Sequence, residues 1–397
     1  MAGRRRASGA RVVLALCLLF VCLVGCGGRT DTDGAKAEVQ RVLDRRAAAM
    51  LDRDEAAYRR TGAPDGFDHL RAVPLAGWSY RLTGLHRTGD TATAEAELRY
   101  RVEGYDRAPV SAGRTLSLSL DAQGEWYVEA ERPAGRSAEQ LWDQGEVSVV
   151  RGDDSLVLGV GQSEAALRSY AELADDAVPA VSQAWGTDWA RHVVVLVPKS
   201  LDDMAGLLGS PASSYRGIAA VTTGETGAPE KAPADRIIVN PDAYGVLGTV
   251  GKKVVLTHET THVATRADTT AATPLWLSEG YADWVGYLGS GRSPSQAAPE
   301  LWRAVSEGSG PRELPADADF GFTGDANKLA RAYESGWMAC RMIADRWGEV
   351  RLGEFYRAVG AHERREGAVE GALKDVLGTS LEGFTGQWRE YLRAQLG

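Results

Sequence analysis

The stretch from Val254 to Thr265, VVLTHETTHVAT, constrains this chain most, because it sets His258, Glu259 and His262 in a His-Glu-x-x-His pattern. On an α-helix, residues four apart project from one face about 6 Å apart along the axis. Two imidazoles placed in this way can bind one tetrahedral zinc ion, and Glu259 lies beside them as a general base for bound water. The alternative is a chance match on an amphipathic helix, which six histidines in 397 residues make rare.

A second acidic pair follows the motif. The segment Pro274 to Trp284, PLWLSEGYADW, predicts a helix with Thr273 as its N-cap and Pro274 at its first position. Because Glu279 and Asp283 also stand four apart, we expect Glu279 to be the third zinc ligand and Asp283 to accept a hydrogen bond from a ligating imidazole. Three protein ligands leave one position for water, which is typical of a catalytic zinc site.

Together, the two segments resemble the gluzincin metallopeptidases, peptidase MA-like enzymes whose clan includes thermolysin and the aminopeptidase-N-like enzymes. The likeness consists of the His-Glu-x-x-His motif and the segment Trp276-Leu-x-Glu279-Gly-x-Ala-Asp283, with 16 residues between His262 and Glu279, and it covers about residues 155 to 395. The resemblance implies one zinc ion, activation of water by Glu259 and orientation of a histidine by Asp283.

Two further features bear on activity. Tyr333-Glu-Ser-Gly336 resembles the Tyr-x-x-Gly segment of the aminopeptidase branch, which implies that Tyr333 donates a hydrogen bond to the oxyanion. The sequence contains no Gly-x-Met-Glu-Asn segment, which in that branch binds the free amine of the substrate, so we expect cleavage within peptides. In gluzincins an extended substrate pairs with a sheet edge, and the apolar segments 217–222 and 236–240 are both candidates for that strand.

The N-terminus predicts a lipoprotein signal. Four arginines, the last of them Arg11, precede an apolar run from Val12 to Val24 that is short for a membrane span. The run ends in Leu-Val-Gly-Cys26, which resembles the bacterial lipobox. Residues 1–25 are therefore expected to be removed, Cys26 to be acylated and residues 26–34 to form a tether at the extracytoplasmic membrane surface. The alternatives are an ordinary signal peptide cut nearby and a short uncleaved anchor.

The net charge and the cysteine content argue against nucleic-acid binding, electrostatic binding to membranes and an intramolecular disulfide. Loss of the signal would take the formal charge from −9 to −13, which disfavours binding to nucleic acid or anionic lipid surfaces. Cys17 and Cys22 would leave with the signal and Cys26 would carry lipid, so Cys340 has no intramolecular disulfide partner. Cys340 lies in an apolar helical stretch, and we expect a buried, unreactive thiol.

The order of patterns predicts an α+β fold. Residues 35–133 begin with a helix from Ala35 to Tyr58 and continue as an antiparallel meander that resembles the cystatin or NTF2-like modules. Residues 134–146 are predicted as a linker. Residues 147–397 are predicted as a gluzincin-like metallopeptidase domain, a mixed sheet over the motif helix with a helical C-terminal lobe.

We therefore predict a zinc metallopeptidase that acts on a peptide or protein substrate. The main alternative is a non-catalytic, zinc-containing binding or scaffolding lipoprotein whose N-terminal module recognises a partner. A structural zinc site would not require Glu259 and would be expected to have four protein ligands. A non-peptidic amide or ester substrate also stays open.

Overall fold

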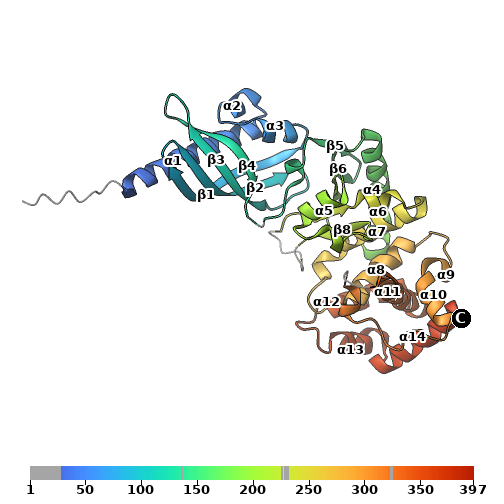
Figure 1. The fold of residues 1–397 in the computed structure, drawn as a ribbon. Helices are drawn as coiled ribbons and strands as arrows, with labels where there is room; N and C mark the ends of the chain where they lie inside the picture. Colours follow the sequence, from blue (N-terminus) through green and yellow to red (C-terminus); the bar gives the residue numbers. More distant parts are fainter. Residues whose placement is uncertain (1–27, 136, 225–226, 228–231, 322–324) are drawn as a thin grey trace, which may run out of the picture.

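A computed structural model describes residues 28–135, 137–224, 227, 232–321 and 325–397. The predicted α+β class is confirmed: a four-stranded antiparallel sheet is followed by a five-stranded mixed sheet and then by a helical C-terminal part (Figure 1). The predicted signal segment, residues 1–25, and Cys26 lie outside the described residues.

The N-terminal module is a meander whose strands lie in sequence order and pair antiparallel. The strands are β1 (Leu75–Thr88), β2 (Thr91–Val102), β3 (Val110–Leu120) and β4 (Trp126–Pro133). Alternate residues of β2 are buried, as period-two patterning requires. Helix α1 (Gly28–Leu51) packs on this sheet through Val39, Leu43 and Met50.

The helix predicted from Ala35 to Tyr58 is in fact broken. Helix α1 ends at Leu51, and α2 (Glu55–Arg59) and α3 (Asp65–Leu70) follow separately. The chain turns at Arg53, whose φ of 58° lies in the left-handed region. Asp54 then starts α2, because its side chain accepts a hydrogen bond from the Ala57 amide. Helix propensity alone hides this break, since an aspartate that caps a new helix also fits inside a polar helix face.

The second sheet has the strand order β5-β6-β7-β9-β8. Its strands are β5 (Val147–Arg151), β6 (Ser155–Val160), β7 (Val193–Val197), β8 (Ala220–Thr223) and β9 (Arg236–Val239). Strands β6, β7 and β9 run parallel, while β5 and β8 are antiparallel edge strands. Of the two segments that the sequence left as candidates for the edge beside the site, the structure therefore selects β8.

Both faces of this second sheet are covered. Helices α4 (Glu164–Trp185), capped by Ser163, and α7 (Thr249–Thr265) pack on one face, with which the side chains Val157, Val195 and Ile237 share a core. The N-terminal module and α5 (Leu201–Leu208) cover the other face, where the inward side chains are Leu158, Leu196 and Ile238. Strands buried on both faces explain the continuous apolar runs in the sequence.

The segment predicted as a linker contributes to the apolar core between the two sheets. A 3-10 turn, η1 (Leu141–Asp143), buries Leu141 and Trp142 against both sheets. Arg114 of β3 donates to both carboxylate oxygens of Asp143 at 2.9 and 2.7 Å, and both side chains are nearly buried. The N-terminal module is thus packed on its neighbour and joined to the connecting segment by a bidentate ion pair.

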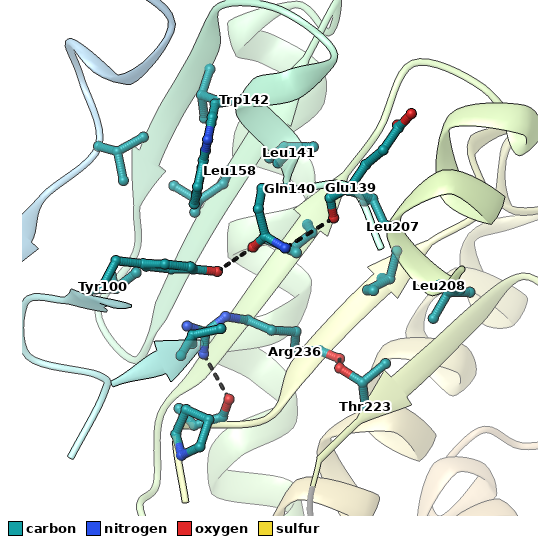
Figure 2. Close-up of a pocket in the computed structure, with 18 of the residues that line it drawn as sticks. Tyr100, Glu139, Gln140, Leu141, Trp142, Leu158, Leu207, Leu208, Thr223 and Arg236 are labelled. Carbon is teal, nitrogen blue, oxygen red and sulfur yellow. Dashed lines mark hydrogen bonds between the residues drawn. The ribbon is translucent and has the colours of Figure 1, made fainter. Parts of the chain in front are cut away.

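A cavity of about 310 Å³ lies between the two sheets and is lined mainly by aliphatic side chains (Figure 2). The polar groups of its wall have partners: the Tyr100 hydroxyl donates to Gln140 Oε1 at 2.7 Å, and Arg236 pairs with both oxygens of Asp106, outside the cavity lining, at 2.9 and 2.8 Å. Asp106 belongs to the β2–β3 connection and Arg236 begins β9. This ion pair therefore ties the N-terminal module to the strand beside the sheet edge.

The C-terminal part is helical and has one continuous core around Trp276, Trp337 and Trp388. Its elements are α8 (Leu275–Tyr287), α9 (Pro294–Ala297), α10 (Pro299–Ser306), η4 (Asp317–Phe320), α11 (Ala326–Trp347), α12 (Glu349–Gly360), α13 (Ala368–Ala372), the π-helical turn η5 (Leu373–Leu377) and α14 (Leu381–Leu396). Short elements η2 (Ala212–Ser214), α6 (Pro241–Gly245) and η3 (Arg266–Asp268) connect the longer ones upstream.

Helices α8 and α11 touch through their backbones at two glycines. A Cβ added to Gly280 would lie 2.3 Å from the backbone carbonyl of Gly336, and one added to Gly336 would lie 2.6 Å from the carbonyl oxygen of Trp276. Neither obstacle is a movable side chain. This close approach holds α11, which carries Tyr333, directly against α8, which carries Glu279.

We expect Gly280→Ala to destabilise the protein by about 1–3 kcal/mol, because the added methyl group must push two packed helices apart. Gly386→Ala is the control, since a Cβ on that α14 residue meets nothing within 4 Å and alanine favours a helix. Thermal and urea unfolding of both variants measure the effect. Equal midpoints for Gly280→Ala and the native protein would contradict the proposed backbone contact.

Candidate metal centre

Helix α7 presents the motif residues on the side that faces α8. His258 and Glu259 are 9% and 6% exposed, and His262 is half-buried one turn further on. The neighbouring Leu256 packs into the core with the mixed sheet and α4. One side of the helix is therefore held by apolar contacts, and the other side presents the motif residues.

Three ligand atoms converge between α7 and α8. The Nε2 atoms of His258 and His262 lie 3.0 Å apart, and Glu279 Oε2 lies 3.2 Å from the first and 3.3 Å from the second. The ligand atoms around a tetrahedral zinc ion with bonds of about 2.0–2.1 Å are about 3.3 Å apart. The nearly equilateral triangle of donor atoms therefore fits zinc in its spacing, and these are the residues from which the sequence predicted a site.

Asp283 lies behind the first histidine. Its Oδ1 is 2.8 Å from His258 Nδ1, so the imidazole donates from Nδ1, and Nε2 is the ring atom that faces the other two donors. The arrangement is the one predicted from the i, i+4 spacing of Glu279 and Asp283 on α8. The part that these residues play in metal binding stays a prediction.

The electrostatics of the cluster also suit a divalent cation. Burial lowers the pKa of His258, but the Asp283 and Glu279 carboxylates outweigh burial and hold that pKa well above its usual range. Burial raises the pKa of Glu279, and the imidazoles of His262 and His258 outweigh it, so that this pKa lies below its usual range. Without a metal, a proton is thus held among the donors. A zinc ion would replace that proton and balance the surplus of carboxylates.

Glu259 is absent from the donor triangle, although it is adjacent to His258 in sequence. One of its carboxylate oxygens, Oε2, accepts a hydrogen bond of 2.6 Å from the hydroxyl of Thr222 on β8. Thr222 could not be predicted from the sequence, because its separation of 37 residues from Glu259 carries no periodic signal. Only the pairing of β8 with β9 brings the two together.

A cleft of about 650 Å³ opens in front of these residues. Its walls come from β8 and the segment before it, from α7 and from α11, and His258, Glu259, Asp283 and Tyr333 all line it. Tyr333 is half-buried, and its ring packs edge-on against Phe320 at 5.2 Å between centroids. Burial and the carboxylates of Glu279, Asp283 and Glu259 raise its pKa well above the usual range, so the hydroxyl keeps its proton near neutral pH.

The other sequence predictions concern the start of α8 and the two cysteines Cys26 and Cys340. Pro274, expected at the first helical position, is the N-cap of α8, and Thr273 accepts a hydrogen bond from the Thr270 amide instead of capping that helix. Cys340 is fully buried, and burial raises the pKa of its thiol, which agrees with an unreactive role. Cys26, the predicted lipidation site, lies outside the described residues.

Comparisons with known proteins leave the family open. No protein-family model matches the sequence. No curated protein matches it either. The structure of native yeast LTA4 hydrolase is similar to this chain with a TM-score of 0.37 and 10% sequence identity, over 82% of this chain and 60% of that chain. The chain thus spans about 60% of the length of that structure. A likeness at this level does not establish a family.

We expect the purified protein to bind close to one zinc ion per chain, because three donor atoms converge on one point. His262→Ala should lose the ion, as measured by elemental analysis after dialysis against a weak chelator. Asp283→Asn keeps all three donors and should weaken affinity by about 10- to 100-fold. His86→Ala, at an exposed histidine of β1, is the control. Full zinc content in His262→Ala would exclude this ligand set.

Proposed function

We propose that this protein is a zinc-dependent hydrolase that cleaves peptide bonds within a chain. One observation carries the proposal: three metal donors converge beside a fourth group, Glu259, that is not a donor and that lines an open cleft. A closed structural zinc site would use a fourth protein ligand and would have no need of a carboxylate in that position. The binding-module alternative lacks any comparable observation in its favour.

When bound, zinc would supply a Lewis acid that lowers the pKa of a water molecule to about 7 and polarises the substrate carbonyl. His258, His262 and Glu279 would hold it, and Asp283 would keep His258 in the tautomer with Nε2 free. Glu259 takes the proton from the attacking water and later delivers it to the leaving nitrogen, so that one carboxylate acts as base and then as acid.

Tyr333 is the second group proposed to act in the reaction. It lines the same cleft as Glu259 and remains protonated near neutral pH, so it can donate a hydrogen bond. As the peptide carbon becomes tetrahedral, its oxygen gains negative charge, and a donor aimed at that oxygen stabilises the transition state. Loss of one such donor in other enzymes costs about 3 kcal/mol.

The substrate proposed for this cleft is an extended peptide. Among the described residues, β9 is the one strand that pairs with β8, so the other edge of β8 has main-chain groups available for an added strand. The cleft walls from α7 and α11 include the apolar side chains of Val254, Val255 and Leu329. Because the chain lacks the Gly-x-Met-Glu-Asn segment that would bind a free amine, the proposed cleavage is internal.

Glu259→Gln should lower peptide hydrolysis by orders of magnitude while zinc content and thermal stability stay close to native, because only the base is removed. Tyr333→Phe should lower kcat with little change in KM, since its bond forms in the transition state alone. Digestion of a peptide library with mass-spectrometric detection measures both effects. If the zinc-loaded native protein cuts no peptide, the hydrolase proposal fails and a binding role takes its place.

We also infer that the protein is attached to the extracytoplasmic face of a membrane through lipid on Cys26. The inference is supported by the apolar run that ends at this cysteine and by the polar residues after it. Among the described residues, no helix combines the length and the hydropathy that crossing a bilayer requires.

Cys26→Ser should move the protein from the membrane fraction to the soluble fraction, because the acylated residue is removed. Cell fractionation followed by mass spectrometry of the N-terminal peptide measures both the location and the processing. Cys340→Ser, which alters a buried thiol far along the chain, is the control. A membrane-bound Cys26→Ser protein with an intact N-terminus would instead indicate an uncleaved anchor.

A further inference from the structure

We propose that Thr222 is a positioning residue for Glu259, and that its hydroxyl reserves one carboxylate oxygen so that the other receives the proton from water. This inference rests on the proposed function, because it concerns the group that acts there as base. It adds a residue from the sheet edge to a site that is otherwise built from helices.

The contact between the two residues is short and directional. Thr222 Oγ1 lies 2.6 Å from Glu259 Oε2 and 3.2 Å from the backbone oxygen of the same residue. A hydroxyl has one proton to donate. The shorter distance and the charge of the acceptor select the carboxylate, since hydrogen bonds to ionised acceptors are shorter and roughly twice as strong as neutral ones.

The surroundings of Glu259 make such a bond necessary. Only 6% of the residue is exposed, and a buried carboxylate is costly unless hydrogen bonds replace its lost water. Within the described part of the chain, Thr222 is the one side chain that donates a hydrogen bond to this carboxylate, and the bond uses Oε2. Oε1 is left for a water molecule in the cleft that Glu259 lines. The two oxygens therefore have different tasks.

The position of Thr222 on β8 links the base to the proposed substrate strand. The Asn240 amide donates to the Ala219 carbonyl, which fixes the alternation of hydrogen bonds along the β8–β9 pair. In this register Thr222, opposite Ile237, is a non-hydrogen-bonded position, so its own N–H and C=O point away from β9 toward the free edge. A peptide paired there would contact the backbone of the residue whose side chain holds Glu259.

The side chain and the backbone of Thr222 would thus fix the position of the base relative to the substrate. Catalysis is sensitive to this relation, because a misplacement of about 1 Å can cost about 100-fold in rate. A threonine on an edge strand is suited to the task, since its branched Cβ restricts χ1 and keeps the hydroxyl in a fixed direction.

The test compares Thr222→Val with Thr222→Ser in the full-length, zinc-loaded protein. Valine keeps the shape of threonine and removes the hydroxyl, whereas serine keeps the hydroxyl and removes the methyl group. We expect Thr222→Val to lower kcat by about 10- to 100-fold with KM within about twofold of native. Zinc content should stay at the native level in both variants, and Thr222→Ser should retain most of the native kcat.

Crystal structures of the same proteins supply a readout that does not depend on activity. Glu259 should occupy one orientation in the native protein and in Thr222→Ser, with Oε2 on the hydroxyl, and should rotate or become disordered in Thr222→Val. An unmoved Glu259 in Thr222→Val would overturn the proposal, and so would equal losses of kcat in both variants, which would indicate a packing role. If the native protein cuts no peptide, the hydrolase proposal fails, while the orientation of Glu259 still decides the role of Thr222.

Discussion

The backbone contact between α8 and α11 is the constraint on which the site depends. Gly280 directly follows Glu279, and Gly336 lies one turn after Tyr333, so the two glycines meet where both helices carry functional candidates. Without side chains at the crossing, the helices approach until main-chain atoms touch. The distance of Tyr333 from the donor triangle is therefore determined by backbone packing, which adjusts less readily than side-chain packing.

The burial of charged side chains is the second constraint on the site. Three carboxylates and two imidazoles share a small volume, and each carboxylate has a partner that makes its charge tolerable: Glu279 faces both histidines, Asp283 faces His258 and Glu259 faces Thr222. The partner atoms differ: Glu279 faces two Nε2 atoms, Asp283 faces an Nδ1 atom and Glu259 faces a hydroxyl, and this difference separates the groups into a candidate ligand, a group that orients a ligand and a candidate base. The environment of each carboxylate, and not its residue type, distinguishes its task.

The mixed sheet connects this site to the rest of the molecule. Its one face supports α7, and its other face is closed by the N-terminal module through a shared apolar core and the Asp106–Arg236 ion pair. Removal of the module would expose the inward side chains of β6, β7 and β9. The module therefore has a structural part in holding β9 and β8, whatever else it binds, because strands in the interior of a fold need cover on both faces.

The sequence by itself determined what depends on local periodicity: the shared helix face of His258 and His262, the Glu279–Asp283 pair and the alternating strands of the first module. Tertiary structure alone decided that β8 is the edge strand beside the site, that Thr222 reaches Glu259, and that two glycines allow α8 and α11 to touch. The physical reason is the distance along the chain over which each feature is encoded. A spacing of two or four residues encodes a direction within one element, whereas strand order and helix approach depend on the packing of distant segments, which no local pattern records.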